Sequence, residues 1–218
     1  RIVETEAYVV GDAAGHAYLG MTGRNRSLFL ERGHAYIYLA YGSSYMLNVS
    51  SEMPGIGAGV LIRALEPLEG IPIMRLNRGI ERLRDLARGP GRLTAAFRVD
   101  RRLDGLDLCR AGPLWLGRGD HEPGEIGPGE IGPGEIGQSI RIGIARDANR
   151  LLRFYLRDNP FVSGPALRLL NGTYHELQSW APPYWSPVDA GNRRRSAFAF
   201  LLSPVSRAQN PTISRACS

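Results

Sequence analysis

The stretch RIVETEAY, residues 1–8, guides the interpretation of the rest of the chain. Its alternation of residue types predicts a β-strand that carries Ile2, Glu4, Glu6 and Tyr8 on one face. Two carboxylates on a core-facing strand cost free energy unless they are partnered or take part in chemistry. A carboxylate in a half-dry site beside an aromatic ring can have a raised pKa and can take a proton from a bound water. A solvated strand face with inert glutamates explains the strand alone equally well.

A second informative stretch is HAYIYLAYGSSYMLNVSS, residues 34–51. Residues 35–41 form an apolar, aromatic run, residues 42–44 favour a turn, and residues 45–49 form another apolar run. This pattern predicts a β-hairpin. Tyr41 falls at the mouth of the turn, where a tyrosine suits an aromatic wedge or a stacking platform for a base. A tyrosine-rich hairpin that packs a core is the alternative.

These stretches resemble the alkyladenine (3-methyladenine) DNA glycosylase family, and the likeness continues in order along the chain. The matching segments are RIVETEAY at 1–8, a histidine at 16, RNRSLF at 24–29, AYIYLAYGSSYMLNVSS at 35–51, VLIRALEPLEG at 60–70, GPGRL at 89–93, RIGI at 141–144 and LRFYLRDNPFVS at 152–163. A single motif of this kind would be weak evidence. Eight collinear segments over three quarters of the chain make the resemblance specific.

The resemblance implies the catalytic groups. Glu6 matches the general base that activates the water attacking the sugar C1′, and Arg63 matches the arginine that supports this glutamate and its water. An arginine within the apolar strand VLIRAL needs a buried anion, and Glu6 is the candidate; a purely structural ion pair is compatible with this. Tyr41 corresponds to the side chain that enters the DNA stack in place of the displaced nucleotide.

The same resemblance implies the pocket for the displaced base. Tyr8 and Tyr38 correspond to walls that sandwich the base, and His16 to a histidine that hydrogen-bonds or stacks against it. Electron-rich rings favour cationic alkylated purines by about 0.5–2 kcal/mol per contact. Asn48 resembles the residue that refuses guanine by clashing with its exocyclic amino group.

All 27 basic residues of the chain are arginine, and lysine is absent from the 218 residues. Glycosylases that also cut the DNA backbone form a Schiff base through an amine, which in this chain only the N-terminus could supply. A guanidinium cannot replace the amine, because it stays protonated. The sequence therefore predicts a monofunctional glycosylase that leaves an abasic site.

The net charge of +6 suits a polyanionic partner. The resemblance implies that this partner is double-stranded DNA containing damaged purines. The candidates for phosphate contacts are Arg24, Arg26, Arg92, Arg101 and Arg102. A solvated surface arginine is the alternative for each of them. The GPGRL segment reads as a turn that opens a short helix, either as a phosphate site or as an ordinary helix start.

The resemblance implies one mixed α/β (α+β) domain with a curved, mostly antiparallel sheet, peripheral helices and a protruding DNA-inserting β-hairpin. We expect the glycosylase domain to cover residues 1–163, to lack the upstream helix and strand of the family, and to contain a flexible PGEIG repeat at 123–137. We expect residues 164–218 to form a disordered tail; a frameshifted end and a basic DNA-touching extension are the alternatives. The expected strands lie near 1–9, 35–41, 45–50, 59–65 and 140–145. Helical patterns appear near 67–87, where Gly70 and Pro72 break them, and near 91–97.

The sequence predicts no cofactor and no metal site, because it has no metal-binding spacing of cysteine and histidine. It contains no apolar run long enough to span a membrane and no signal peptide, so we expect an intracellular monomer, in the cytoplasm or nucleoid of a bacterium. The alternative function is a non-catalytic module of the same fold that binds damaged nucleic acid. The presence of both Glu6 and Arg63 favours the enzyme.

Overall fold

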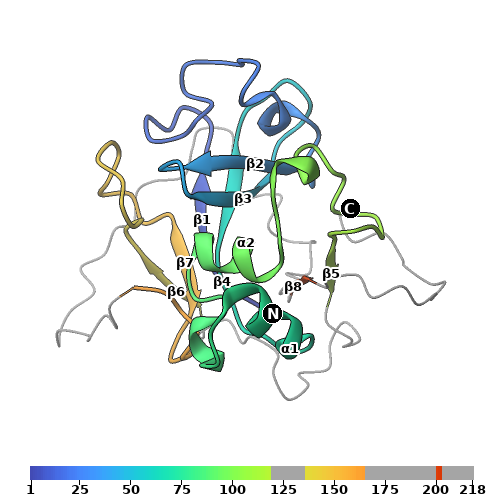
Figure 1. Ribbon diagram of the computed structural model, residues 1–218. Coiled ribbons are helices and arrows are strands. Elements are labelled where there is room, and N and C mark those ends of the chain that lie inside the picture. The colour runs from blue at the N-terminus through green and yellow to red at the C-terminus, as the bar shows by residue number, and fades with distance from the viewer. Residues whose placement is uncertain (119–135, 165–199, 203–218) are drawn as a thin grey trace, which may run out of the picture.

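The computed structural model describes residues 1–118, 136–164 and 200–202 (Figure 1). Within these ranges the main sheet has six strands in the order β2-β3-β4-β1-β7-β6, and every neighbouring pair is antiparallel. The strands are β1 (Ile2–Tyr8), β2 (Ala35–Ala40), β3 (Ser44–Ser50), β4 (Gly59–Leu65), β6 (Ile136–Ser139) and β7 (Arg153–Leu156). A small second sheet pairs β5 (Leu116–Arg118) with β8 (Phe200–Leu202).

Short helices accompany the sheet, which confirms the predicted α+β class. The α-helices are α1 (Ile71–Arg78) and α2 (Pro90–Ala96), and the 3₁₀ turns are η1 (Arg26–Phe29), η2 (Leu83–Asp85) and η3 (Arg101–Leu103). Proline at the first position of α2 suits a helix start, because its ring fixes φ and the N–H it lacks would have no partner there.

The two faces of the sheet have different uses. Ile37, Leu47 and Ile62 project from β2, β3 and β4 into the main apolar core, where they meet Leu93 of α2. Figure 1 shows α2 beside β3 and in front of β4. Because strand side chains alternate between faces, the neighbouring residues of the same strands project to the opposite side, where they line a cavity. The core on one face therefore fixes the cavity walls on the other.

The pairing of β1 with β4 contains two irregularities that cancel. Val3 on β1 and Arg63 on β4 have no partner in the register, which otherwise runs from Ile2 opposite Leu65 to Tyr8 opposite Gly59. Each is an extra residue of the kind found in a β-bulge, and bulges re-aim side chains. One bulge on each strand restores the original register, and Arg63 is buried at the second bulge.

Several sequence expectations need correction. The strand expected at 140–145 is wrong: residues 140–145 are irregular, and the edge strand β6 precedes them. Within 67–87 the predicted break at Gly70 is confirmed, since Gly70 takes a left-handed conformation just before α1, but Pro72 lies inside α1. The pattern also stops at Gly79, which is left-handed as well, so that only α1 and η2 form there. Strand β7 was not predicted.

The PGEIG repeat and the tail fall largely outside the described residues. The last two residues of the repeat, Ile136 and Gly137, belong to β6 rather than to a loop. In the tail, residue 164 and strand β8 are described.

Candidate active site

Glu6 is fully buried in the middle of β1, and its carboxylate has three donors. The backbone N–H of Ile142 donates to Oε1 at 2.7 Å, and Arg63 Nη1 lies 3.1 Å from the same oxygen. The Tyr8 hydroxyl donates to Oε2 at 3.1 Å. A carboxylate offers about four lone-pair sites, so one remains on Oε2. Glu6 also lines the cavity, where this site could accept a hydrogen bond from a water.

Arg63 joins the two glutamates of β1. Its Nε donates to Glu4 Oε1 at 3.0 Å, while its Nη1 pairs with Glu6. The predicted pairing of Arg63 with Glu6 is thus confirmed. The prediction did not include Glu4, which accepts from the Nε of the same guanidinium. The i, i+2 spacing puts both carboxylates on one face of the strand.

Glu4 also anchors a second arginine from β7. Arg153 Nε donates to Glu4 Oε1 at 2.7 Å, and Ser163 donates to Glu4 through its backbone N–H at 2.6 Å and its hydroxyl at 3.0 Å. Two arginines and two glutamates make this buried cluster electrically neutral, which a low-dielectric interior requires. Only Arg63 and Glu6 of the four charged groups line the cavity.

A second buried ion pair, between Arg141 and Asp12, packs against the ring of Tyr8. The Arg141 guanidinium lies over the Tyr8 ring, 4.6 Å from its centroid, and donates from Nη2 to Asp12 at 3.0 Å. Burial alone would raise the pKa of Asp12, but its bonds with Arg141 lower it. Burial, followed by the charge of Glu6, raises the pKa of the Tyr8 hydroxyl, which therefore stays protonated and donates to Glu6.

The other wall of the cavity is aromatic. The rings of His16 and Tyr38 are edge to face with centroids 4.4 Å apart, and Tyr36 stacks on Tyr38 at 5.5 Å. His16 Nδ1 shares a 2.7 Å hydrogen bond with the Tyr36 hydroxyl, and burial lowers the pKa of the imidazole. Asn25 of the RNRSLF segment donates to the His16 carbonyl at 2.8 Å and so fixes the loop that carries this ring.

These groups enclose a cavity of about 520 Å³, which falls in the usual size range of small-molecule sites. Asn48 lies in its wall, and its amide donates to the Tyr36 carbonyl at 3.1 Å. The cavity brings together every catalytic and pocket residue expected from the sequence: Glu6, Tyr8, His16, Tyr38, Asn48 and Arg63, with Tyr41 at its edge.

Tyr41 is the first of two left-handed residues in the turn between β2 and β3. Its φ is 54° and that of Gly42 is 68°, and the Ser43 N–H donates to the Ala40 carbonyl at 3.1 Å. Positive φ at both central positions defines a type I′ turn, whose twist matches that of the strands. The Tyr41 side chain is 91% exposed, so no packing holds it in this conformation.

The expected phosphate-binding arginines differ in their surroundings. Arg24 and Arg26 are exposed and line neither this cavity nor a second cleft nearby. Arg92 is exposed and pairs with Asp85 at 3.3 Å. The other two have local acceptors: Arg101 donates to the Ile37 carbonyl at 2.9 Å, and Arg102 pairs with Asp100 at 2.7 Å.

Sequence reasoning missed Arg141, Arg153 and Tyr36 as parts of the site. Arg153 carries the same signal that identified Arg63, a single charge in an apolar strand pattern. Tyr36 shares a strand face with Tyr38 and was not given a role. Across the described ranges, no cluster of histidine, cysteine, aspartate and glutamate could hold a metal ion, and no helix is long and apolar enough to cross a membrane.

Comparison with known proteins bears on this arrangement. Residues 1–160 match the family described as "Methylpurine-DNA glycosylase (MPG)". The chain belongs to this family. A relative from Mesorhizobium japonicum is 74% identical over 165 residues, which cover 76% of this chain and 74% of the relative. One from Paraburkholderia phytofirmans is 50% identical over 165 residues, covering 76% and 73%. Both are named "Putative 3-methyladenine DNA glycosylase".

Proposed function

We propose that the chain excises damaged purines from double-stranded DNA and leaves an abasic site. The observation that carries the proposal is the buried carboxylate of Glu6 at the wall of an aromatic cavity, with three of its acceptor sites filled and one left for a water. A base stacked in a duplex shields its glycosidic bond, so the nucleotide must rotate out, at a cost of a few kcal/mol. The cavity would receive it.

The proposed chemistry is hydrolysis. Glu6 takes a proton from the water, the oxygen attacks C1′, and the base leaves with the electron pair of the glycosidic bond. An alkylated purine carries a positive charge that this departure neutralises, and the rings of Tyr8 and Tyr38 favour such a cation. We assign Asn48 the exclusion of guanine and Tyr41 the insertion into the duplex. The absence of lysine supports a monofunctional enzyme.

The test is release of a base from a duplex oligonucleotide with one hypoxanthine or one ethenoadenine. Strand cleavage should appear only after alkali, and cleavage without alkali would contradict the monofunctional assignment. Glu6→Gln should keep lesion binding and lose excision. Glu69→Gln, an exposed glutamate that lines neither cavity, is the matched control and should excise like the parent.

Two results would overturn the assignment. Excision by Glu6→Gln at the parent's rate would show that another group is the base. Lesion binding by a folded parent protein without any excision would instead identify a damage-binding module. We also propose that the enzyme is a monomer acting on chromosomal DNA inside the cell; light scattering of the purified chain would check the monomer.

A further inference from the structure

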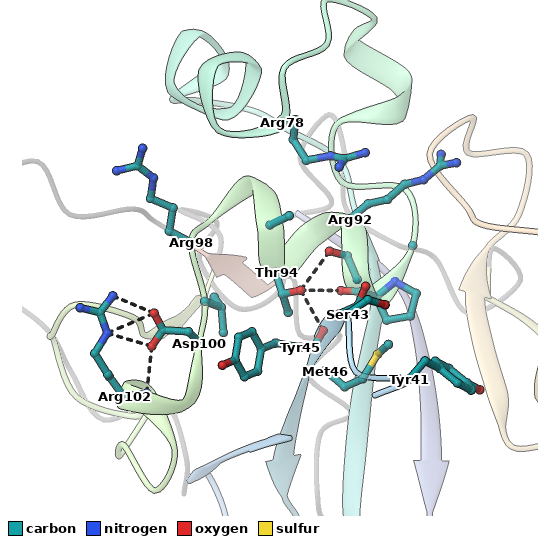
Figure 2. Close-up of a pocket in the computed structure, with 16 residues that line it drawn as sticks. Tyr41, Ser43, Tyr45, Met46, Arg78, Arg92, Thr94, Arg98, Asp100 and Arg102 are labelled. Atoms are coloured by element: carbon teal, nitrogen blue, oxygen red, sulfur yellow. Dashed lines mark hydrogen bonds and ion pairs between the residues drawn. The ribbon is translucent and has the colours of Figure 1, made fainter. Parts of the chain in front are cut away.

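A second, larger cleft of about 840 Å³ lies on the other side of the Tyr41 turn, between the hairpin and α2 (Figure 2). It shares Tyr41, Met46 and Pro90 with the base cavity, so the two hollows adjoin at the turn. In Figure 2 the Tyr41 side chain points away from the arginines drawn around the cleft. These arginines are Arg78, Arg92, Arg98 and Arg102.

The charge of this cleft is only partly balanced. Arg102 pairs with Asp100, and Arg92 pairs with Asp85 outside the lining. Arg78 donates its Nε to a backbone carbonyl, which carries no compensating charge. The Arg98 side chain is exposed and has neither a hydrogen bond nor an ion pair with any described residue; only its backbone N–H is bonded, to the Ala95 carbonyl at 3.2 Å. The cleft therefore keeps an excess of positive charge.

Arg98 also has an unusual backbone. It follows the C-cap residue of α2 with a φ of 53°, in the left-handed region where a helix end most often has glycine. The chain thus carries a long cationic side chain where glycine would suit the backbone better. Two backbone bonds of a Schellman motif hold this helix end, from the Arg98 N–H to the Ala95 carbonyl at 3.2 Å and from the Val99 N–H to the Thr94 carbonyl at 2.8 Å. The Arg98 side chain contributes no hydrogen bond or ion pair among the described residues.

A hydrogen bond and a close backbone approach join α2, which lines the cleft, to the hairpin that carries Tyr41. Thr94 of α2 donates its hydroxyl to the Tyr45 carbonyl of the hairpin at 2.8 Å. Gly91 lies so close to the hairpin that a Cβ added there would come within 2.8 Å of Ser44 Cβ. The backbone of α2, which carries Arg92, therefore lies directly against the hairpin that carries Tyr41.

We propose that this cleft binds the phosphodiester backbone of the DNA next to the nucleotide that Tyr41 displaces, with Arg98 as a direct phosphate contact. Guanidinium groups bind phosphate through charge-assisted, often paired hydrogen bonds. The inference rests on the proposed function, because the role of Tyr41 sets where the duplex lies. It adds a backbone site on the far side of the hairpin from the base cavity.

The test is Arg98→Gly, because glycine suits the backbone at this position. Its melting temperature should equal or exceed that of the parent, so weaker binding cannot come from unfolding. Binding to a lesion-free duplex is measured by fluorescence anisotropy between 50 and 200 mM salt. Loss of one phosphate contact should lower the slope of log Kd against log salt by about 0.9, so the salt rise should weaken the parent about 3.5-fold more than the variant.

Arg157→Gln is the matched control, since Arg157 is exposed, lines neither cavity and carries the same charge. It should keep the parent's slope, and Arg98→Gln should reproduce the loss seen with Arg98→Gly. In a duplex with one lesion, which sets the register, a neutral methylphosphonate is moved along each strand. At one position it should lower the binding affinity of the parent and leave that of Arg98→Gly unchanged.

Parent-like affinity and slope for both Arg98 variants would overturn the inference. Equal losses for Arg98 and Arg157 variants would also overturn it, because they would indicate bulk charge instead of a contact. Neither readout depends on excision. Absence of base release by the parent would therefore count against the proposed function alone.

Discussion

Replacing Glu4 by glutamine should destabilise the protein strongly, although Glu4 does not line the base cavity. Glu4 is 1% exposed and is the shared acceptor of Arg63, Arg153 and Ser163. Glutamine has nearly the same shape, but it removes the charge that balances one of two buried arginines. If its carbonyl replaces Oε1, its NH₂ group faces the Ser163 N–H, and two donors oppose each other.

The expected loss is that of a broken buried ion pair, about 3–5 kcal/mol of unfolding free energy. For a chain of this size each kcal/mol corresponds to about 2–4 °C, so the melting temperature should fall by about 6–20 °C. Excision at a temperature where the variant stays folded should fall too, because Arg63 loses the partner that fixes its guanidinium beside Glu6.

Thermal unfolding followed by circular dichroism measures the first effect, and single-turnover base release measures the second. Glu69→Gln, at an exposed site, should melt within about 2 °C of the parent, because surface substitutions change stability by about 0.5 kcal/mol or less. A Glu4→Gln variant that melts with the parent would refute the idea that Glu4 neutralises the buried arginines.

Three further outcomes are expected. Tyr41→Gly should raise stability by about 1 kcal/mol in thermal unfolding, because an exposed left-handed tyrosine is strained, and should weaken lesion-duplex binding; a lower melting temperature would contradict this. Burial lowers the pKa of His16 below its ordinary 6.5, so near that pH the unfolded chain binds more protons at this residue than the folded chain does. The folded state therefore gains stability from pH 5.5 to pH 8. Urea unfolding should show that the parent's stability relative to His16→Gln is greater at pH 8 than at pH 5.5. Arg141→Met should cost about 3–5 kcal/mol in the same assay by leaving Asp12 unpaired, and Asp12→Leu combined with it should recover part of that loss; simple additivity would count against the pair.

The sequence predicted four of the six strands of the main sheet, β1 to β4, because the residue pattern that indicates each of them lies within the strand itself or in the adjoining turn. The alternation in RIVETEAY placed both glutamates on one face, and the hairpin pattern placed Tyr41 at its turn. The edge strands were missed or misplaced: β7 is short, and β6 begins within the PGEIG repeat, whose glycine and proline mask a strand signal. Their pairing with β1 or each other is long-range.

The site was predicted less completely, since a sequence shows charges without their partners. A single arginine in VLIRAL indicated a buried anion, but that Glu4 and Glu6 share it depends on the bulge at Arg63. The support of Tyr8 by Arg141 joins residues 133 positions apart in the chain. The proximity of the two clefts depends on how α2 packs on β3.

The paired bulges of β1 and β4 limit how this gene can change in length. Deletion of Val3 alone would shift the part of β1 before it, or the part after it, by one residue relative to β4. A shift of one residue turns every side chain of the shifted part to the opposite face of the sheet. Glu4 would then no longer share Arg63 with Glu6, or the side chains of Glu6 and Tyr8 would no longer line the cavity. An insertion or deletion in one of these two strands is tolerable only when the other strand changes by the same number of residues, so the face that carries Glu6 and Arg63 is inherited as one unit.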